Sequence, residues 1–234
     1  MSRLASLFRM IAILARHGTR RAGDVAIHKA DVFLGHVRPD LAAALDRLEP
    51  VVPVLDMEAL RALPVGTFGR GYADFLDANG LHPFVVTELT SPTVLARTVH
   101  WARYAVVHDM IHVLLGAGPD LVGEMKVYAF TLTQRLSLAF WLFLPLAWLV
   151  LPLGVPHRLG ALVRAFRGGL ALGRRCPDVL AMRLEDRFGD DLDAVRGDLG
   201  LPRLQSAEGG GTRAGGAEVE RSAARESDRS GPHG

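Results

Sequence analysis

The residues of this chain best suited to chemistry are two histidines and two carboxylates between positions 108 and 124. His108 and His112 are four residues apart, so on a helix their imidazoles project from one face, one turn apart. Two histidines at this spacing can bind a single metal ion. Asp109 would lie about 100° round the same helix, where it can be a further ligand or orient a histidine.

Glu124 can join this set only if the chain reverses after His112. On one unbroken helix the two residues would be about 18 Å apart. Residues 116–120, GAGPD, interrupt the helical pattern, and Asp120 can cap a new helix. We therefore expect a helix, a turn and a second helix that returns Glu124 to the histidine pair.

The surroundings of the cluster favour a bound metal. Burying these polar side chains without partners is costly, and one metal ion would satisfy all four. Zinc, iron and manganese all suit two imidazoles and two carboxylates. Asp109 stands where a zincin has its general-base glutamate, so a peptidase is not implied. The alternative is a pair of ordinary helix histidines without a metal. The apolar neighbours are Tyr104, Val106, Val107, Ile111, Val113, Leu114 and Leu115.

Turn and cap signals predict an all-α fold, in which helices position this cluster. Residues 51–55 and 84–87 are the only β-branched runs, and both are short. Ser91 followed by Pro92 predicts the start of a long helix. The expected helices are residues 39–49, 57–63 after a cap at Asp56, a segment from Thr67 or Gly69 to Asn79-Gly80, 92–115, 120–134, 158–174 and 178–188.

Two segments raise the question of a membrane. The first 23 residues contain five arginines and no acid, with apolar residues at helical spacing, which predicts an amphipathic first helix. A mitochondrial transit peptide has a compatible composition. Residues 136–156 are uncharged and long enough to span a bilayer, but three prolines interrupt them. We expect a broken, buried or interfacial helix there, with a true span as the alternative. The apolar residues of the first helix are Leu4, Leu7, Phe8, Ile11 and Leu14.

Composition sets the domain organisation and excludes some functions. The chain has 234 residues, of which 49% are hydrophobic and 22% charged. Residues 1–204 are expected to form one helical domain, and the Gly/Arg/Glu-rich residues 205–234 a disordered tail. A net charge of +2, spread along the chain, gives no support for a nucleic-acid partner. Cys176 is the single cysteine, which excludes an intrachain disulfide.

Two blocks of sequence resemble a known family. His108, Asp109 and His112, followed by eleven residues and Glu124, match the HDxxH-x11-E signature of the coenzyme Q (ubiquinone) biosynthesis proteins of the fourth Coq family. Residues 63–83, LPVGTFGRGYADFLDANGLHP, resemble a second family block. Arg103-Tyr104, just before the signature, fits the family as well.

The resemblance implies an all-helical protein with a divalent metal, usually zinc, and a hydrophobic channel for a polyprenyl tail. It implies peripheral attachment to a membrane: the cytoplasmic side in a bacterium, or the mitochondrial inner membrane in a eukaryote. The implied partners are a polyprenylated aromatic lipid, the membrane surface and other quinone-biosynthesis proteins, and a homodimer is left open. The implied activity is decarboxylation or oxidative decarboxylation at ring carbon 1 of a polyprenyl-hydroxybenzoate.

On this interpretation His108, His112 and Glu124 are metal ligands, and Asp109 is a fourth ligand or orients one of them. Arg103 and Tyr104, one turn earlier, either touch the substrate or have a structural role. Two other functions stay open. One is a non-catalytic lipid-binding scaffold of the biosynthetic complex. The other is an HD-type phosphohydrolase, which would also recruit His82 and Asp178.

Overall fold

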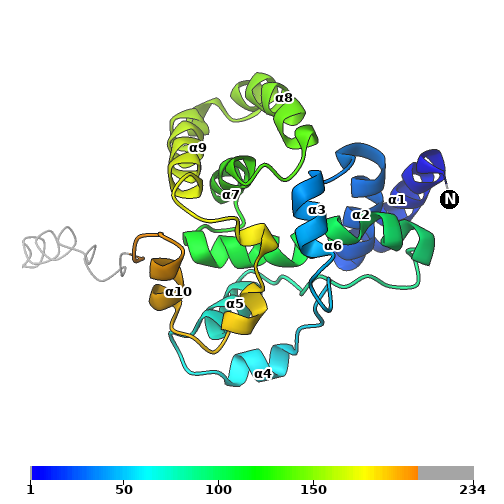
Figure 1. Cartoon of the computed structure of the whole chain (residues 1–234). Coiled ribbons are helices and arrows are strands. Elements are labelled where there is room, and N and C mark those ends of the chain that lie inside the picture. Colours follow the sequence, from blue (N-terminus) through cyan, green and yellow to red (C-terminus); the bar gives the residue numbers. More distant parts are fainter. Residues whose placement is uncertain (1, 205–234) are drawn as a thin grey trace, which may run out of the picture. The chain divides into compact units, whose positions relative to one another are not determined.

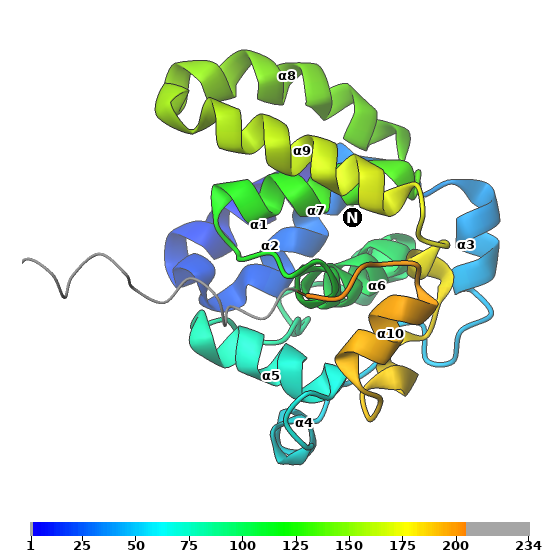
Figure 2. The same cartoon turned by 90° about the vertical axis from the view of Figure 1, so that its left-hand side faces the viewer.

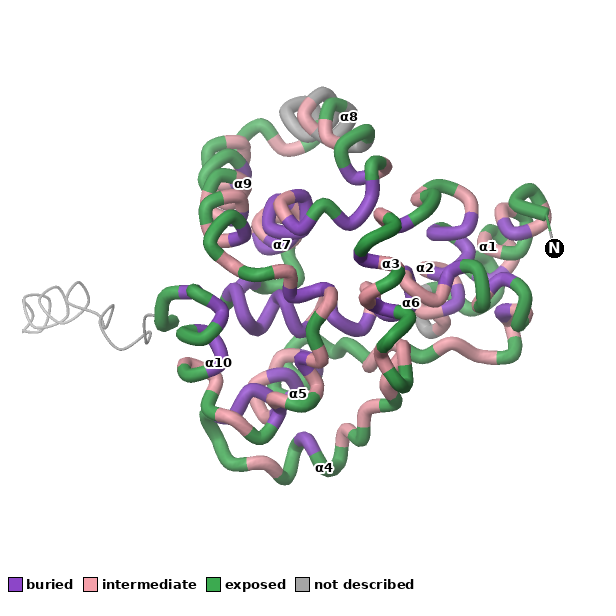
Figure 3. Tube along the Cα trace, viewed as in Figure 1, coloured by how far each residue is buried: buried purple, intermediate pink, exposed green. Residues whose placement is uncertain are grey.

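Helix α6 (Pro92–Leu115) is the centre of the fold. We describe residues 2–204 of a computed structural model. As predicted, α6 begins with Ser91 at its N-cap and Pro92 in its first turn. It ends at Gly116, whose left-handed conformation turns the chain. Residues 110–115 are all buried, and α5 (Phe68–Ala78) and α7 (Leu121–Thr133) pack against α6 (Figures 1 and 3).

Helices α2 (Ala22–Lys29), α5 and α7 pack directly on α6, and the other helices pack outside them. Helix α9 packs along α7 (Figure 2) because Gly169 permits close approach: a Cβ there would lie 2.2 Å from the carbonyl oxygen of Lys126. The helices other than α6 are α1 (Arg3–His17), α2 (Ala22–Lys29), α3 (Pro39–Leu45), α4 (Met57–Ala62), α5 (Phe68–Ala78), α7 (Leu121–Thr133), α8 (Leu138–Gly154), α9 (Leu159–Gly173) and α10 (Leu192–Asp198). Short turns of 3-10 or π helix are η1 (Gly18–Arg21), η2 (Ala30–Leu34), η3 (Pro156–Arg158), η4 (Val179–Ala181) and η5 (Leu184–Arg187).

The all-α prediction is confirmed. Among residues 2–204 there is no β-strand, only one isolated bridge between Thr67 and Asp191. No helix of this part of the chain is long and apolar enough to cross a membrane. The prediction of a disordered tail concerns residues 205–234, which lie outside the described residues.

Three helix starts follow the predicted caps. The carboxylate of Asp56 accepts hydrogen bonds from the backbone N–H groups of Glu58 and Ala59 at the start of α4. Thr67, rather than Gly69, caps α5. Asp120 accepts a hydrogen bond from the Gly123 N–H at the start of α7. These local signals are reliable because each cap satisfies backbone donors of its own first turn.

The predicted helix over residues 178–188 is wrong. The segment instead forms two 3-10 turns, η4 and η5. Buried polar side chains from elsewhere hold its backbone in this form: the Met182 carbonyl accepts a hydrogen bond from Arg103, and the Gln134 amide oxygen accepts one from the Val179 N–H. These bonds replace the i to i−4 bonds that a helix would need.

Of the broken, buried or interfacial helix expected over residues 136–156, the broken form is wrong. Helix α8 runs without interruption from Leu138 to Gly154, through Pro145 and Pro152. Each proline removes one backbone donor from this helix. A smaller difference concerns α3, which ends at Leu45 rather than at residue 49.

Helix α1 exposes its apolar face. Phe8 is 64% exposed and Ile11 53%. The helix packs through its opposite side, where Ile13 is buried and the Ser6 hydroxyl donates to the carboxylate of Asp31 in η2. The amphipathic pattern was therefore predicted correctly, and its apolar stripe faces away from the rest of the protein.

Candidate metal centre

The turn between α6 and α7 brings three of the predicted residues together. His108 Nε2 lies 3.5 Å from Glu124 Oε2, and His112 Nε2 lies 3.3 Å from Glu124 Oε1. One donor atom from each residue fits within 4.8 Å of the other two, so the three side chains form a candidate metal-binding triad. Both histidines come from α6 and Glu124 from the first turn of α7, as the spacing required.

The turn also orients His112. Its Nδ1 lies 3.1 Å from the carbonyl oxygen of Ala117, and the Ala117 N–H donates back to the His112 carbonyl at 2.9 Å. A carbonyl can only accept, so Nδ1 carries the hydrogen and Nε2 keeps its lone pair for a metal. The Phe75 ring stacks on the His112 ring with 5.4 Å between the ring centroids, and the His112 side chain is only 1% exposed.

Asp109 takes a different position from the three triad residues. Its Oδ1 lies 3.3 Å from Nδ1 of His108, on the opposite side of the ring from the nitrogen that faces Glu124. This is the arrangement in which a carboxylate orients a ligating histidine. Of the two roles predicted for Asp109, the geometry favours orientation over direct ligation.

The electrostatics of the cluster suit a cation. Burial lowers the pKa of His108, but hydrogen bonds and charge from Asp109 and Glu124 outweigh it and raise the pKa to about 9. Burial raises the pKa of Glu124, but the two histidines outweigh it and lower the pKa to about 2. The cluster therefore stabilises positive charge between its side chains.

The residues present fit a divalent metal. Two imidazole nitrogens and one carboxylate converge, and each histidine has a partner on its other ring nitrogen. A purely structural metal site would need a fourth protein ligand. Three protein ligands leave a coordination position for substrate or water. The donor set suits zinc, iron or manganese without selecting one.

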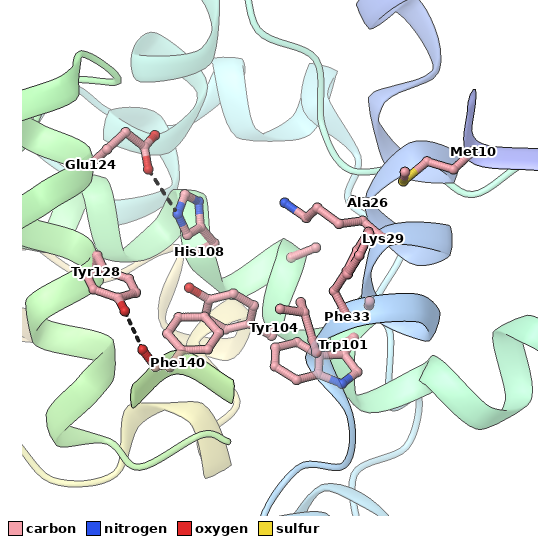
Figure 4. A pocket seen from close by; sticks show the side chains of 13 residues that line it. Met10, Ala26, Lys29, Phe33, Trp101, Tyr104, His108, Glu124, Tyr128 and Phe140 are labelled. Atoms are coloured by element: carbon pink, nitrogen blue, oxygen red, sulfur yellow. Dashed lines mark hydrogen bonds and ion pairs between the residues drawn. The ribbon is translucent and has the colours of Figure 1, made fainter. Parts of the chain in front are cut away.

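Two residues of the triad, His108 and Glu124, line an apolar pocket of about 670 Å³. Trp101, Tyr104 and Phe140 form an aromatic wall, in which the Trp101 and Phe140 rings stack at 6.0 Å. Figure 4 shows His108 and Glu124 on one side of the pocket and the side chains of α2 and η2 on the other. The full lining is Met10, Ala26, Lys29, Ala30, Phe33, Leu34, Trp101, Tyr104, Ala105, His108, Glu124, Tyr128 and Phe140.

The two predicted substrate residues are placed differently. Tyr104 lines the pocket, and its ring lies 5.7 Å from that of His108. Arg103 is 1% exposed and points elsewhere: its guanidinium pairs with both carboxylate oxygens of Glu185 at 2.8 and 2.9 Å. The geometry thus favours the structural role for Arg103 and keeps the substrate role for Tyr104.

Several pocket residues could not be found from the sequence. Met10, Lys29 and Phe33 reach the pocket from α1, α2 and η2, which are distant from the signature along the chain. Only Lys29 carried a signal, because 25 of the 27 basic residues are arginines and it is one of two lysines.

The residues proposed for a phosphohydrolase lie apart from the triad. His82 is exposed in the loop after α5. Asp178 binds the guanidinium of Arg38. Neither residue belongs to the cluster of His108, His112 and Glu124, the one three-residue metal-ligand group among the described residues. The geometry gives no support to that function.

Comparison with known proteins agrees with the signature. Residues 50–205 match the family described as Coenzyme Q (ubiquinone) biosynthesis protein Coq4. The mitochondrial ubiquinone biosynthesis protein COQ4 homolog of Bos taurus is 36% identical over 155 residues, 63% of this chain and 55% of its own length. The homolog of Xenopus tropicalis is 30% identical over 201 residues, 82% of this chain and 66% of its own. The chain thus spans about half the length of the mammalian relatives.

A solved structure agrees on the fold. The crystal structure of a Nostoc punctiforme protein described as a "putative ubiquinone biosynthesis protein" matches with a TM-score of 0.55 and 20% identity, over 85% of this chain and 96% of that one. Fold and site together define an all-α protein with a two-histidine, one-carboxylate cluster beside an apolar pocket. The match to the family over residues 50–205 identifies the chain within this class: it belongs to the Coq4 family of coenzyme Q biosynthesis proteins.

Proposed function

We propose that this chain acts in ubiquinone biosynthesis, on a polyprenyl-hydroxybenzoate, in the removal of the carboxyl group at ring carbon 1. The observation that carries the proposal is the candidate triad beside a pocket with an aromatic wall, in a chain of this family. Such a pocket suits a lipid with a flat polar ring and an apolar tail.

In the proposed step the bond between ring carbon 1 and the carboxyl carbon breaks, carbon dioxide leaves, and a proton takes its place on the ring. The oxidative form would put a hydroxyl there instead, and it needs dioxygen and a two-electron reductant as co-reactants. A divalent metal held by His108, His112 and Glu124 would supply Lewis-acid stabilisation of the charge that develops on the substrate.

The chain's own residues bind the ring and exclude water. Trp101 and Phe140 offer faces on which an aromatic ring can stack, and Tyr104 presents its edge to both. Burial raises the pKa of Tyr104, so its hydroxyl stays protonated at neutral pH and can donate to a substrate oxygen. Asp109 and the Ala117 carbonyl hold the two histidines in place.

The exposed stripe of α1 suggests how a prenyl tail reaches the pocket. Met10 and Phe33 line the pocket from the α1 side, and the neighbouring apolar face of α1 is exposed. Arg3 and Arg16 are exposed on the same helix, where they suit anionic headgroups. We propose that α1 lies on a membrane surface and that the tail passes from the bilayer into the pocket.

The test is analysis of quinone intermediates by mass spectrometry in a strain that lacks this protein. The proposal expects one carboxylated prenyl precursor to accumulate, and expects the His108→Ala and Glu124→Ala proteins not to relieve it. A mixed loss of all intermediates would instead favour the scaffold alternative. Full rescue by both variants with unchanged metal content would contradict any role of the triad.

A further inference from the structure

The chain uses arginine almost everywhere, and both of its lysines lie near the candidate site. Lys126 and Lys29 are the only lysines among 27 basic residues. Lysine is a compact point charge, whereas arginine is a broad planar fork. The two lysines are exceptions to this arginine bias, and the contacts of each ammonium group indicate what it does.

Lys126 has a structural explanation. Its ammonium donates a hydrogen bond of 2.6 Å to the Leu115 carbonyl at the C-terminal end of α6. Such carbonyls have no partner within their own helix, and a cation stabilises them.

Lys29 is exposed, and no such contact with a helix end accounts for it. It lies in the last turn of α2, but α2 continues directly into η2, so no free helix end faces its ammonium. Within the described part of the chain it makes no hydrogen bond or ion pair, although Asp31 lies nearby and is bound by Arg97 and Ser6.

Lys29 lies on the wall of the apolar pocket. It is one of the lining residues, and Figure 4 shows its amine directed across the pocket, toward the side where His108 and Glu124 lie. In this view Tyr104 and Trp101 lie below the amine and the two candidate ligands. A ring held in the pocket would have the triad at one edge and a single positive charge near another.

We infer that Lys29 binds the anionic carboxylate of the aromatic substrate and so determines specificity for a carboxylated ring. The inference rests on the proposed function, because it assumes that the pocket binds the ring. A hydrogen bond between an ammonium and a carboxylate is charge-assisted and is therefore stronger than one between neutral groups. Lys29 is thereby a binding residue on the wall opposite the candidate metal ligands.

The test compares two probes by isothermal titration calorimetry: a hydroxybenzoate with a short prenyl chain, and its methyl ester. We expect the wild-type protein to bind the acid about tenfold more tightly than the ester, a preference typical of one charged hydrogen bond. In Lys29→Met the two affinities should become equal through loss of acid binding. Lys29→Arg should keep part of the preference. The matched control is Arg47→Met, which removes an exposed charge elsewhere and should leave the preference unchanged.

Ester binding is the internal control for folding, and Lys29→Gln replaces Lys29→Met should the latter lose both ligands. Equal binding of acid and ester by the wild-type protein, or a preference that survives in Lys29→Met, would overturn the inference and leave the proposed function intact. Failure of the wild-type protein to bind either probe would contradict both. Metal content should be unchanged in every Lys29 variant.

Discussion

At the scale of single residues, the candidate ligands depend on neighbours that hold their rings. The Ala117 carbonyl holds His112 and the Asp109 carboxylate holds His108. The pair of candidate histidines was predictable because helical spacing fixes which side chains share a face, and Glu124 because residues 116–120 interrupt the helix and let the chain reverse. The contact between His112 and Ala117 was not predictable, because any residue type at position 117 would offer the same backbone carbonyl.

Asp109→Asn tests the difference between an orienting residue and a ligand. If Asp109 orients His108, the variant should still bind one metal equivalent at saturating metal, with affinity about 10- to 100-fold weaker. Competition titration with a chelator measures this. The control is His100→Ala, a change on the same helix as Asp109 that breaks a surface contact with Asp46. It should not alter metal affinity. Complete loss of stoichiometric metal would instead identify Asp109 as a direct ligand.

Arg103→Met separates a structural role from substrate contact. The variant leaves the Glu185 carboxylate, only 8% exposed, without its partner, which should cost about 3–5 kcal/mol of unfolding free energy. Urea denaturation measures the loss. The substrate role would predict the opposite pattern, with stability retained and ligand binding weakened.

At the scale of elements, the site depends on how closely α7 approaches the turn after α6. A Cβ at Gly123 would lie 1.9 Å from the carbonyl oxygen of Gly118, so only glycine fits beside Glu124. The caps and the length of α6 were predictable from local residues. The segment over residues 178–188 was not, because distant groups such as Arg103 determine its backbone. The pocket was not predictable either, since its walls meet only through tertiary packing.

Gly123→Ala should displace the start of α7 and with it Glu124. We expect a loss of about 1–3 kcal/mol in stability together with weaker metal binding. Thermal unfolding with and without added metal measures both. Gly168→Ala in α9 is the matched control, because a Cβ there meets no atom within 4 Å, and it should not weaken metal binding. Unchanged affinity in Gly123→Ala would show that the position of Glu124 does not depend on this contact.

At the scale of the whole molecule, we propose that the apolar stripe of α1 and the pocket form one path for a lipid. The sequence predicted an amphipathic helix, but the pattern alone could not distinguish core packing from an exposed face. The structure has Ser6 and Ile13 on the packed side and Leu4, Phe8 and Ile11 exposed. The membrane proposal depends on that difference.

Replacing Leu4, Phe8 and Ile11 together with serine should weaken binding to anionic liposomes by at least about tenfold, since three apolar side chains no longer enter the bilayer. Flotation assays measure this. Stability should change little, because the three side chains are exposed. Val54→Ser is the control, since Val54 is 97% exposed elsewhere on the surface. Equal flotation of the triple variant and the wild-type protein would contradict a membrane role for α1.

The most direct test of the account is the metal content of the purified protein, measured by inductively coupled plasma mass spectrometry. The arrangement of His108, His112 and Glu124 predicts about one equivalent of a divalent transition metal in the wild-type protein. The same arrangement predicts none in His112→Ala, which should remain folded by circular dichroism. A wild-type protein that takes up no metal under saturating conditions, or a His112→Ala protein that keeps a full equivalent, would contradict the central claim.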